Sequence, residues 1–349
     1  MALRVLFIGG TGTISSACAR HAVAEGIELT LVNRGASTLR PEPEGVEAIR
    51  ADVRDPGALR AALGRRTFDA VVDFVAFTPE HVRTDLEVFE GRTGQYVFIS
   101  SASVYQKPPA RLPITESTPL RNPHWAYARA KIACEDLLTR AYRERGFPVT
   151  IVRPSHTYDD LSVPLNFRWT DVARMRRGDP VVVHGDGTSL WTLTHHTDFA
   201  RTFTGLLGHP QAIGDAFHIT SDELLTWNQI YALVAAAAGA EPHLVHVPSA
   251  VIAAADPAVG EGLLGDRTHS VLFDNSKVRA LVPAHGTTVP FAAGARRIVE
   301  WYDAHPEHAV VDPALEALSD RLVAAVADAP RPAAPGHGAP TATGRPAPR

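Results

Sequence analysis

Tyr127 and Lys131 stand four residues apart in WAYARAKIACEDLL, residues 125–138, which otherwise has the Ala-, Leu- and Ile-rich composition of a packed helix. On a helix this spacing places both side chains on one face, one turn apart. A phenol ordinarily titrates near ~10, and a neighbouring ammonium favours the phenolate and brings proton transfer into reach of neutral pH. The pair therefore indicates acid–base chemistry, although a solvated helix can carry the same spacing by chance.

A glycine-rich turn follows the first apolar run, in VLFIGGTGTISSACAR. Glycines let the backbone turn sharply and approach a pyrophosphate, and the helix that follows offers free N–H groups and its positive dipole end. Ser15 occupies the place where a third small residue lets the helix pack against the strand. The turn predicts dinucleotide binding, with a tight turn that holds no ligand as the alternative. The residues expected at the cofactor are Gly9, Gly10, Thr11, Gly12, Thr13 and Ile14.

The second apolar run ends in LVNRG and lacks the carboxylate that enzymes preferring NAD usually present to the ribose 2′-hydroxyl. Asn33 and Arg34 suit a 2′-phosphate instead, so the sequence favours NADP while NAD stays possible. The alternative is that Arg34 is a solvated loop residue. Asp52 and Val53, in ADVRD, are expected at the adenine, whose amino group can donate to the Asp carboxylate.

The elements that must position these residues alternate along the first 155 residues. Strand-like apolar runs cover 3–9, 27–33, 46–52, 68–77, 95–100 and 148–154. Helical patterns lie near 13–25, 56–64, 79–90 and 124–145. Strands that are apolar on both faces and separated by helices predict a parallel sheet covered on both sides, which is the Rossmann-type doubly wound α/β fold.

After His156 the elements become short and irregular, which predicts a smaller C-terminal α+β substrate lobe. Its expected pieces are helices near 167–177, from about 198, at 227–238 and at 291–303, with the runs DPVVVHGDG and AFHIT between them. We expect a Rossmann domain over 1–155 with later returns of the chain, a mainly substrate-binding lobe over 156–328, and a disordered Pro-, Ala- and Gly-rich tail over 329–349.

The composition excludes several classes of protein. The 349 residues are 45% apolar and 21% charged with a net charge of -4, which is ordinary for a globular protein and argues against a nucleic-acid-binding surface. Cys18 and Cys134 cannot build a disulfide framework, and no metal-binding spacing is present. No apolar run approaches the ~20 residues of a membrane span. The expectation is a cytoplasmic protein without a membrane, metal or nucleic-acid partner.

The motifs together resemble the extended short-chain dehydrogenase/reductase family, its NAD-dependent epimerase/dehydratase group, over about residues 3–305. The resemblance rests on GGTGTIS, ADVRD, ISSASVY, YARAK, VRPSHTY, GDGTSLWTLTHHTDFA and FDNSKVRALVP, in this order. It implies that Tyr127 is the acid–base beside the nicotinamide, that Lys131 also holds the nicotinamide ribose, and that Ser101 hydrogen-bonds the substrate hydroxyl. Val75 and Pro154 are further expected cofactor contacts. It also implies a homodimer formed through the helices near 79–90 and 124–145.

Three departures from the family pattern bear on the substrate. Ala102 and Ser103 stand where the sugar-nucleotide 4,6-dehydratases carry an Asp-Glu pair. His156 replaces an Asn that touches the sugar and, titrating near ~6.5, is either an acid or base or a structural histidine. Trp191 replaces an Arg that clamps a diphosphate, which favours a nucleoside or another small glycoside; in the alternative, Trp191 fills the core and an Arg such as Arg267 meets the phosphate.

Phe77 and His195 complete the residues expected at the substrate, with a structural role as the alternative for His195. We therefore expect an enzyme that transiently oxidises a hydroxyl of a nucleoside or other glycoside with a bound nicotinamide cofactor, epimerises or dehydrates the product, and returns the hydride. One alternative is an NADPH-dependent ketone reductase. Another is a non-catalytic nucleotide- or RNA-binding relative, because NRG also resembles chloroplast stem-loop RNA-binding proteins.

Overall fold

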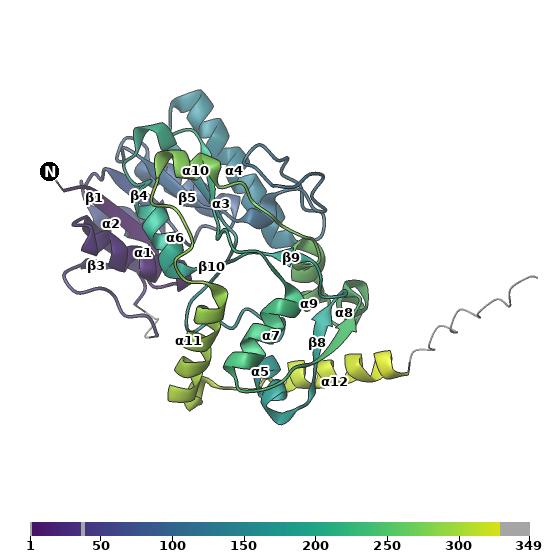
Figure 1. Cartoon of the computed structure of the whole chain (residues 1–349). Coiled ribbons are helices and arrows are strands. Elements are labelled where there is room, and N and C mark those ends of the chain that lie inside the picture. The colour runs from purple at the N-terminus through teal and green to yellow at the C-terminus, as the bar shows by residue number, and fades with distance from the viewer. Residues whose placement is uncertain (1, 36–38, 329–349) are drawn as a thin grey trace, which may run out of the picture.

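A seven-stranded sheet forms the N-terminal half of the computed structural model, which describes residues 2–35 and 39–328 (Figure 1). The expected tail over 329–349 lies outside the described residues. All neighbouring strands pair in parallel, in the order β11-β6-β5-β4-β1-β2-β3. The strands are β1 (Arg4–Ile8), β2 (Glu28–Asn33), β3 (Glu47–Arg50), β4 (Ala70–Asp73), β5 (Tyr96–Ile99), β6 (Val149–Pro154) and β11 (Ala216–Ile219).

Helices cover both faces of the sheet because its strands carry apolar side chains on both sides. In β1, Val5 and Phe7 join the core on one face while Leu6 and Ile8 join the core on the other. The first face is covered by α1 (Thr13–Ala24), α6 (His196–Thr204) and α10 (Ser276–Leu281). The second is covered by α2 (Pro56–Leu63), α3 (Pro79–Phe89) and α4 (Ala126–Arg145). The predicted doubly wound parallel sheet is confirmed.

One apolar run lies elsewhere than expected. AFHIT was assigned to the irregular lobe, but residues 216–219 return to the sheet as β11 and pair with β6. Phe217 and Ile219 are each 1% exposed and belong to the core beneath α1 and α6. The run joins the sheet because both residues find an apolar layer there, and because the parallel edge of β6 offers backbone partners.

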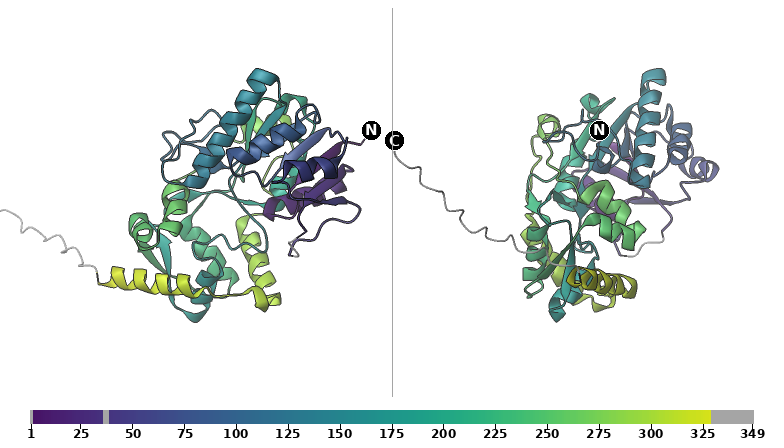
Figure 2. Two further views of the ribbon diagram at one scale, coloured as in Figure 1. Left: turned by 180° about the vertical axis from the view of Figure 1, so that it is seen from behind. Right: turned by 90° about the vertical axis from the view of Figure 1, so that its right-hand side faces the viewer.

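The remaining elements form a lobe below the sheet, with α12 at the end farthest from it (Figure 2). Its two-stranded pairs are β10–β7, β12–β9 and β13–β8. The strands are β7 (His156–Tyr158), β8 (Pro180–His184), β9 (Leu190–Trp191), β10 (Leu193–His195), β12 (Leu225–Thr226) and β13 (His243–Val247). The helices are α5 (Trp169–Arg177), α7 (Trp227–Ala237), α8 (Ser249–Ala255), α9 (Pro257–Gly262), α11 (Phe291–Ala304) and α12 (Pro313–Ala327).

Four short helical turns complete the chain. Three are 3-10 turns, at Ala102–Val104 (η1), Pro210–Ala212 (η2) and Pro306–His308 (η4). The fourth, η3 (Leu263–Arg267), is a π-helical turn that follows α9. Single π turns often occur at functional sites. This turn lies against the N-terminus of α4, because a Cβ on Gly265 would come 2.6 Å from the Cβ of Trp125.

Candidate active site

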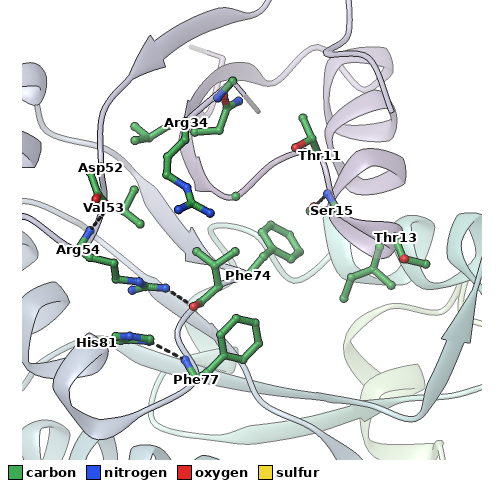
Figure 3. Close-up of a pocket in the computed structure, with 17 residues that line it drawn as sticks. Thr11, Thr13, Ser15, Arg34, Asp52, Val53, Arg54, Phe74, Phe77 and His81 are labelled. Atoms are coloured by element: carbon green, nitrogen blue, oxygen red, sulfur yellow. Dashed lines mark hydrogen bonds between the residues drawn. The ribbon is translucent and has the colours of Figure 1, made fainter. Parts of the chain in front are cut away.

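A cavity of about 560 Å³ opens at the carboxyl ends of β1, β2 and β4 (Figure 3). Gly9, in the turn after β1, has a φ of +84°, and a Cβ there would lie 2.5 Å from Val75 Cγ1. A Cβ on Gly10 would lie 2.6 Å from Leu31 Cδ2. Ser15 Oγ accepts a hydrogen bond of 2.7 Å from the Gly12 N–H. The turn therefore requires glycine for both its conformation and its packing.

Most of the residues predicted to meet a dinucleotide line this cavity. They are Gly9, Thr11, Gly12, Thr13, Ile14, Asn33, Arg34, Asp52, Val53 and Val75. Gly10 is not among the lining residues and packs against β2 instead. A glycine cradle that a side chain would fill, followed at once by the N-terminus of α1, fits a nicotinamide dinucleotide.

The two residues expected to select NADP differ in their surroundings. The Asn33 amide donates to Glu42 Oε1 at 2.6 Å, and its oxygen accepts from the Gly35 N–H at 2.8 Å and from Arg50. Asn33 is thus occupied by protein partners. Arg34 is exposed, and Figure 3 shows its guanidinium turned into the cavity. Of the pair, Arg34 is the group that can reach a phosphate.

Several residues that line this cavity are not among those predicted to meet the cofactor, including Arg54 and His81, and one residue predicted elsewhere also lies here. Arg54 donates to the Val75 carbonyl, and His81 Nδ1 accepts from the Phe77 N–H at 3.0 Å. Phe77, expected at the substrate wall, instead lines this first cavity. The reason is local: the loop after β4 is held by these two hydrogen bonds, which turn the 44% exposed ring toward the cofactor side. The sequence predicts no role for His81 or for Arg54 of ADVRD, because each acts through a backbone group.

Lys131 lies beneath the site on α4 and is 1% exposed. Its ammonium donates to the carbonyls of Ala76 and Ile99, both at 2.7 Å, at the ends of β4 and β5. Its Nζ is 4.7 Å from the centre of the Phe77 ring and 5.8 Å from that of Tyr127. Burial lowers the pKa of Lys131 to about 8, against the opposing effect of nearby Asp73.

Tyr127 does not show the lowered pKa that its spacing from Lys131 suggested. Burial raises the pKa of the phenol, and a hydrogen bond with Ser101 acts in the opposite direction. The physical reason is that the Lys131 ammonium is directed at two backbone carbonyls while the phenol is largely removed from water. Ser101 Oγ also lies 2.9 Å from Ser103 Oγ.

A second cavity, of about 690 Å³, lies between the sheet and the lobe. It brings together Ser101, Tyr127, His156 and Trp191. Pro154, expected at the cofactor, lines this cavity instead, because it ends β6 directly before the chain enters the lobe.

His195, expected at the substrate, lines neither cavity. It ends β10 and is 2% exposed. Its Nδ1 lies 2.7 Å from Thr197 Oγ1, and its ring packs edge-on against Tyr158. The structure therefore gives His195 a packing role.

His156 and Trp191 form a hydrogen-bonded pair in the wall of the second cavity. The indole Nε1 of Trp191 donates to His156 Nδ1 at 3.1 Å. Burial and the charge of Arg267 lower the pKa of His156 to about 3, which favours the neutral imidazole at physiological pH. Its role as an acid or base, or as a structural histidine, stays a prediction. Trp191 is 2% exposed and packs on Trp227 with ring centres 5.3 Å apart, which leaves little of its face for stacking on a substrate.

Charged residues from the lobe loops also reach this cavity, and most of them escaped the sequence analysis. Arg168 lines it with a φ of +56°, a strained conformation for a residue with a side chain. Arg267 donates to Asn166 Oδ1 at 3.3 Å. Within residues 2–35 and 39–328, neither arginine has a carboxylate within 4.0 Å. Asp266 lines the same wall and pairs with Lys107 Nζ at 2.6 Å.

Two expected absences concern the described part of the chain. Among residues 2–35 and 39–328, no group of three or more His, Cys, Asp or Glu side chains is arranged to hold a metal ion. In the same ranges no helix combines the length and apolar character needed to cross a bilayer.

The chain is similar to one family model and to several known proteins. The model of the NAD dependent epimerase/dehydratase family matches residues 5–220. A chloroplast stem-loop binding protein of 41 kDa from Arabidopsis thaliana is 28% identical over 70% of this chain and 65% of its own length. The 2'-dehydrokanamycin reductase of Streptomyces kanamyceticus is 28% identical over 71% of this chain and 70% of its own. The UDP-glucose 4-epimerase of Streptomyces lividans is 31% identical over 40% of this chain, and the match spans 47% of that enzyme.

Solved structures share the fold over nearly the whole chain. An epimerase from Methanothermobacter thermautotrophicus superposes with a TM-score of 0.72 at 18% identity, over 88% of this chain and 94% of its own. The UDP-glucose 4-epimerase of Bifidobacterium longum, solved with NAD+ and UDP, superposes with a TM-score of 0.70 at 19% identity, over 87% and 99%. At these identities the likeness establishes the architecture.

Proposed function

Because the chain belongs to the NAD dependent epimerase/dehydratase family, we propose that it transiently oxidises one hydroxyl of a sugar and then epimerises or dehydrates that sugar. One observation carries the proposal: Tyr127 and Ser101 line the second cavity, directly above the buried ammonium of Lys131. The first cavity adjoins them through Phe77, whose ring centre lies 6.4 Å from that of Tyr127.

The side chains of this site divide the work of the oxidation step. A nicotinamide dinucleotide, when bound, accepts the hydride and later returns it. Tyr127 takes the hydroxyl proton, and Ser101 hydrogen-bonds the substrate oxygen and steadies its developing negative charge. Lys131, held by two carbonyls, keeps a positive charge beneath the Tyr127 ring, with its Nζ 5.8 Å from the ring centre.

Asp266 is the candidate base for the step at carbon. Oxidation to a ketone makes the neighbouring C–H acidic, so a base must remove that proton. Ala102 and Ser103 supply no carboxylate, whereas Asp266 is the carboxylate among the described residues that line the second cavity. Its ion pair with Lys107, at 2.6 Å, holds the carboxylate in the wall of the cavity.

The charge of the cavity points to an anionic substrate. Arg168 and Arg267 line it, and guanidinium groups match the oxygens of phosphate and carboxylate groups. A backbone conformation as costly as that of Arg168 persists where its surroundings hold it, commonly at ligand sites. These arginines support the alternative in which an Arg such as Arg267 meets a phosphate, so the proposed substrate is a sugar or nucleoside that carries a phosphate or carboxylate.

A reductase is the second candidate, because Arg34 suits a 2′-phosphate and the 2'-dehydrokanamycin reductase of Streptomyces kanamyceticus is similar to this chain. Reduced-cofactor absorbance during turnover of a converted substrate separates the two. A closed cycle leaves the absorbance unchanged once turnover is steady. Stoichiometric consumption of NADPH would reject the cycle in favour of the reductase.

Replacement of the phenol tests for catalysis itself. Tyr127→Phe should lower kcat by about 10² to 10⁴-fold and leave cofactor affinity within a few-fold of the wild type. Tyr142→Phe, a change of a half-exposed tyrosine farther along α4, is the matched control. A non-catalytic binder, like the stem-loop binding protein that the chain resembles, would be indifferent to both changes.

A further inference from the structure

The hydrogen bond between Trp191 and His156 determines where the imidazole carries its proton. An indole N–H can only donate, so the ring nitrogen that receives it must present a lone pair. Trp191 Nε1 lies 3.1 Å from His156 Nδ1. The single proton of the neutral ring is therefore on Nε2.

Trp191 has no freedom to release this bond. It is 2% exposed, and β9 holds its backbone against Leu225 of β12. Its ring lies 5.3 Å from that of Trp227, whose own indole N–H donates to the Arg267 carbonyl at 3.2 Å. A buried indole N–H needs a partner, and among the described residues His156 is the partner of Trp191.

Protonation of His156 would place two N–H groups against each other at this contact. The imidazolium donates from both nitrogens, so its Nδ1–H would face the Trp191 N–H. Arg267, which also lines the cavity, adds a positive charge that opposes protonation, and burial acts in the same direction. The other titratable groups that line this cavity are Tyr127, Arg168 and Asp266. On the neighbouring elements β10 and α6, His195 bonds to Thr197 and His196 bonds to Thr13. Asp198 of α6 bonds to Arg201 and Thr288.

We propose that Trp191 is a positioning residue that fixes His156 as the Nε2–H tautomer, so that His156 is a substrate-binding donor that recognises one acceptor oxygen of the substrate. The nitrogen concerned has no hydrogen bond among the described residues, and the ring lines the second cavity. With Arg168 and Arg267 on the same wall, the recognition groups are donors, which fit a substrate group rich in acceptor oxygens. That the acceptor is an oxygen of a sugar substrate rests on the proposed function. The Nε2–H tautomer of His156 does not, because it follows from the bond with Trp191.

Nitrogen NMR of the full chain, with its histidines labelled, tests the tautomer without any substrate. The chain has 16 His, and the His156 signal is identified as the one that His156→Asn removes. In the wild type this signal should report a neutral ring with its proton on Nε2 throughout about pH 5 to 8, the range in which an ordinary histidine titrates. In Trp191→Phe the ring should populate both tautomers, because the donor that fixed the lone pair on Nδ1 is gone.

Trp301→Phe removes an indole from a surface stack with His305 and is the matched control, expected to leave the His156 signal unchanged. A wild-type His156 that titrates within this range, or that carries its proton on Nδ1, would overturn the proposal. An unchanged tautomer in a folded Trp191→Phe protein would overturn it as well.

Steady-state kinetics with the substrate test the donor. His156→Phe should raise KM about threefold to tenfold, the effect of losing one hydrogen bond, with kcat little changed. His156→Asn keeps an N–H donor and should remain closer to the wild-type KM. Equal effects of the two changes would mean that the ring only fills space. If no sugar is turned over at all, the proposed function fails, while the NMR result still decides the tautomer.

Discussion

At the scale of single residues, Lys131 places an ammonium group in a position that is almost completely buried. One of its two carbonyl partners is Ala76, in the loop after β4, and the other is Ile99, at the end of β5. Asp73, whose charge acts on it, accepts hydrogen bonds from the backbone N–H groups of Val75 and Ala76. The Asp73 carboxylate thus orients the loop after β4, and the Ala76 carbonyl of that loop accepts a hydrogen bond from the Lys131 ammonium.

The pKa of Lys131 predicts how activity depends on pH. The ammonium is present below about 8 and is lost as pH rises through that value, so kcat should fall on the alkaline side. Lys131→Gln should lower kcat about 10²-fold and remove this alkaline fall. Lys277→Gln, which changes a lysine paired with Asp215 away from the site, should retain both the rate and the profile. An alkaline fall that persists in Lys131→Gln would contradict this assignment.

Asp266 makes a separate prediction about the step at carbon. Asp266→Asn should lower overall turnover about 10²-fold or more while the first oxidation still occurs, so reduced cofactor should accumulate after substrate is added. Rapid-mixing absorbance measures this directly. Asp222→Asn, at a surface ion pair with Arg279, is the control. If Asp266→Asn turns over at the wild-type rate, Asp266 is not the base and its role is limited to the ion pair with Lys107.

Asp73 and Asp85 form a pair of carboxyl groups, both 0% exposed. Each has one oxygen without a hydrogen-bond donor among the described residues, and a single shared proton would satisfy both. Burial and the charge of Asp73 raise the pKa of Asp85 well above its ordinary value, so Asp85 is the protonated member. Its other oxygen accepts from the Tyr96 hydroxyl at 2.6 Å.

Stability should therefore depend on Asp85 with a defined sign. Above the ordinary pKa of a carboxyl, the unfolded chain ionises while folded Asp85 keeps its proton, so stability is lost as pH rises toward the folded pKa. Asp85→Asn keeps the donor and has no proton to lose, so at pH 7 it should be more stable than the wild type by about 1 kcal/mol or more. Urea unfolding at neutral pH and near pH 4 measures the difference, which should vanish at the lower pH. A less stable Asp85→Asn protein at pH 7 would contradict the shared proton.

At the scale of elements, the sequence predicted those parts whose cause is local. The glycine turn and β1 follow from adjacent residues, and α4 from its apolar spacing and the closing Gly146 at +69°. The second cavity could not be predicted from local sequence. Arg168 directly precedes α5 and Asp266 lies in η3, and only the folded lobe brings them to Tyr127. The His156–Trp191 bond also spans 35 positions, so no local pattern records it.

The turn after β1 predicts a difference between two glycines with similar backbone angles. Gly9→Ala must adopt a φ of +84° and also displace Val75, whereas Gly26→Ala must adopt +76° with nothing within 4 Å. Both should lose about 1 kcal/mol or more for the backbone. Only Gly9→Ala should in addition abolish dinucleotide binding, as measured by fluorescence titration and melting with cofactor. Equal cofactor affinity in the two variants would mean that the cradle does not hold the dinucleotide.

At the scale of the whole molecule, α4 places Tyr127 in the second cavity, and the Phe77 ring of the first cavity lies 6.4 Å from the Tyr127 ring. Helix α4 packs beside α3, and Arg145 of α4 is paired to Glu90 at 2.9 Å. Ala130 lies partly exposed on α4. Small side chains of this kind permit close helix packing between copies of the chain.

We predict a homodimer formed through α3 and α4. Sedimentation of the wild type should give twice the mass of the chain, and Ala130→Arg should give monomers, because a long charged side chain prevents close approach of the helices. Ala324→Arg, on α12 at the far end of the lobe, should leave the dimer intact. If the wild type sediments as a monomer, the predicted homodimer through α3 and α4 is wrong.

The late return of β11 to the sheet has a consequence for synthesis on the ribosome. When the first 200 residues have emerged, every wall of the nucleotide cradle has been translated, yet β6 still presents a bare backbone edge until residues 216–219 follow. Unpaired edges invite association between chains. A translational pause before this point would leave a nascent protein whose cradle is translated while β6 is an edge strand. β11 then pairs with β6 and takes the edge position of the sheet itself.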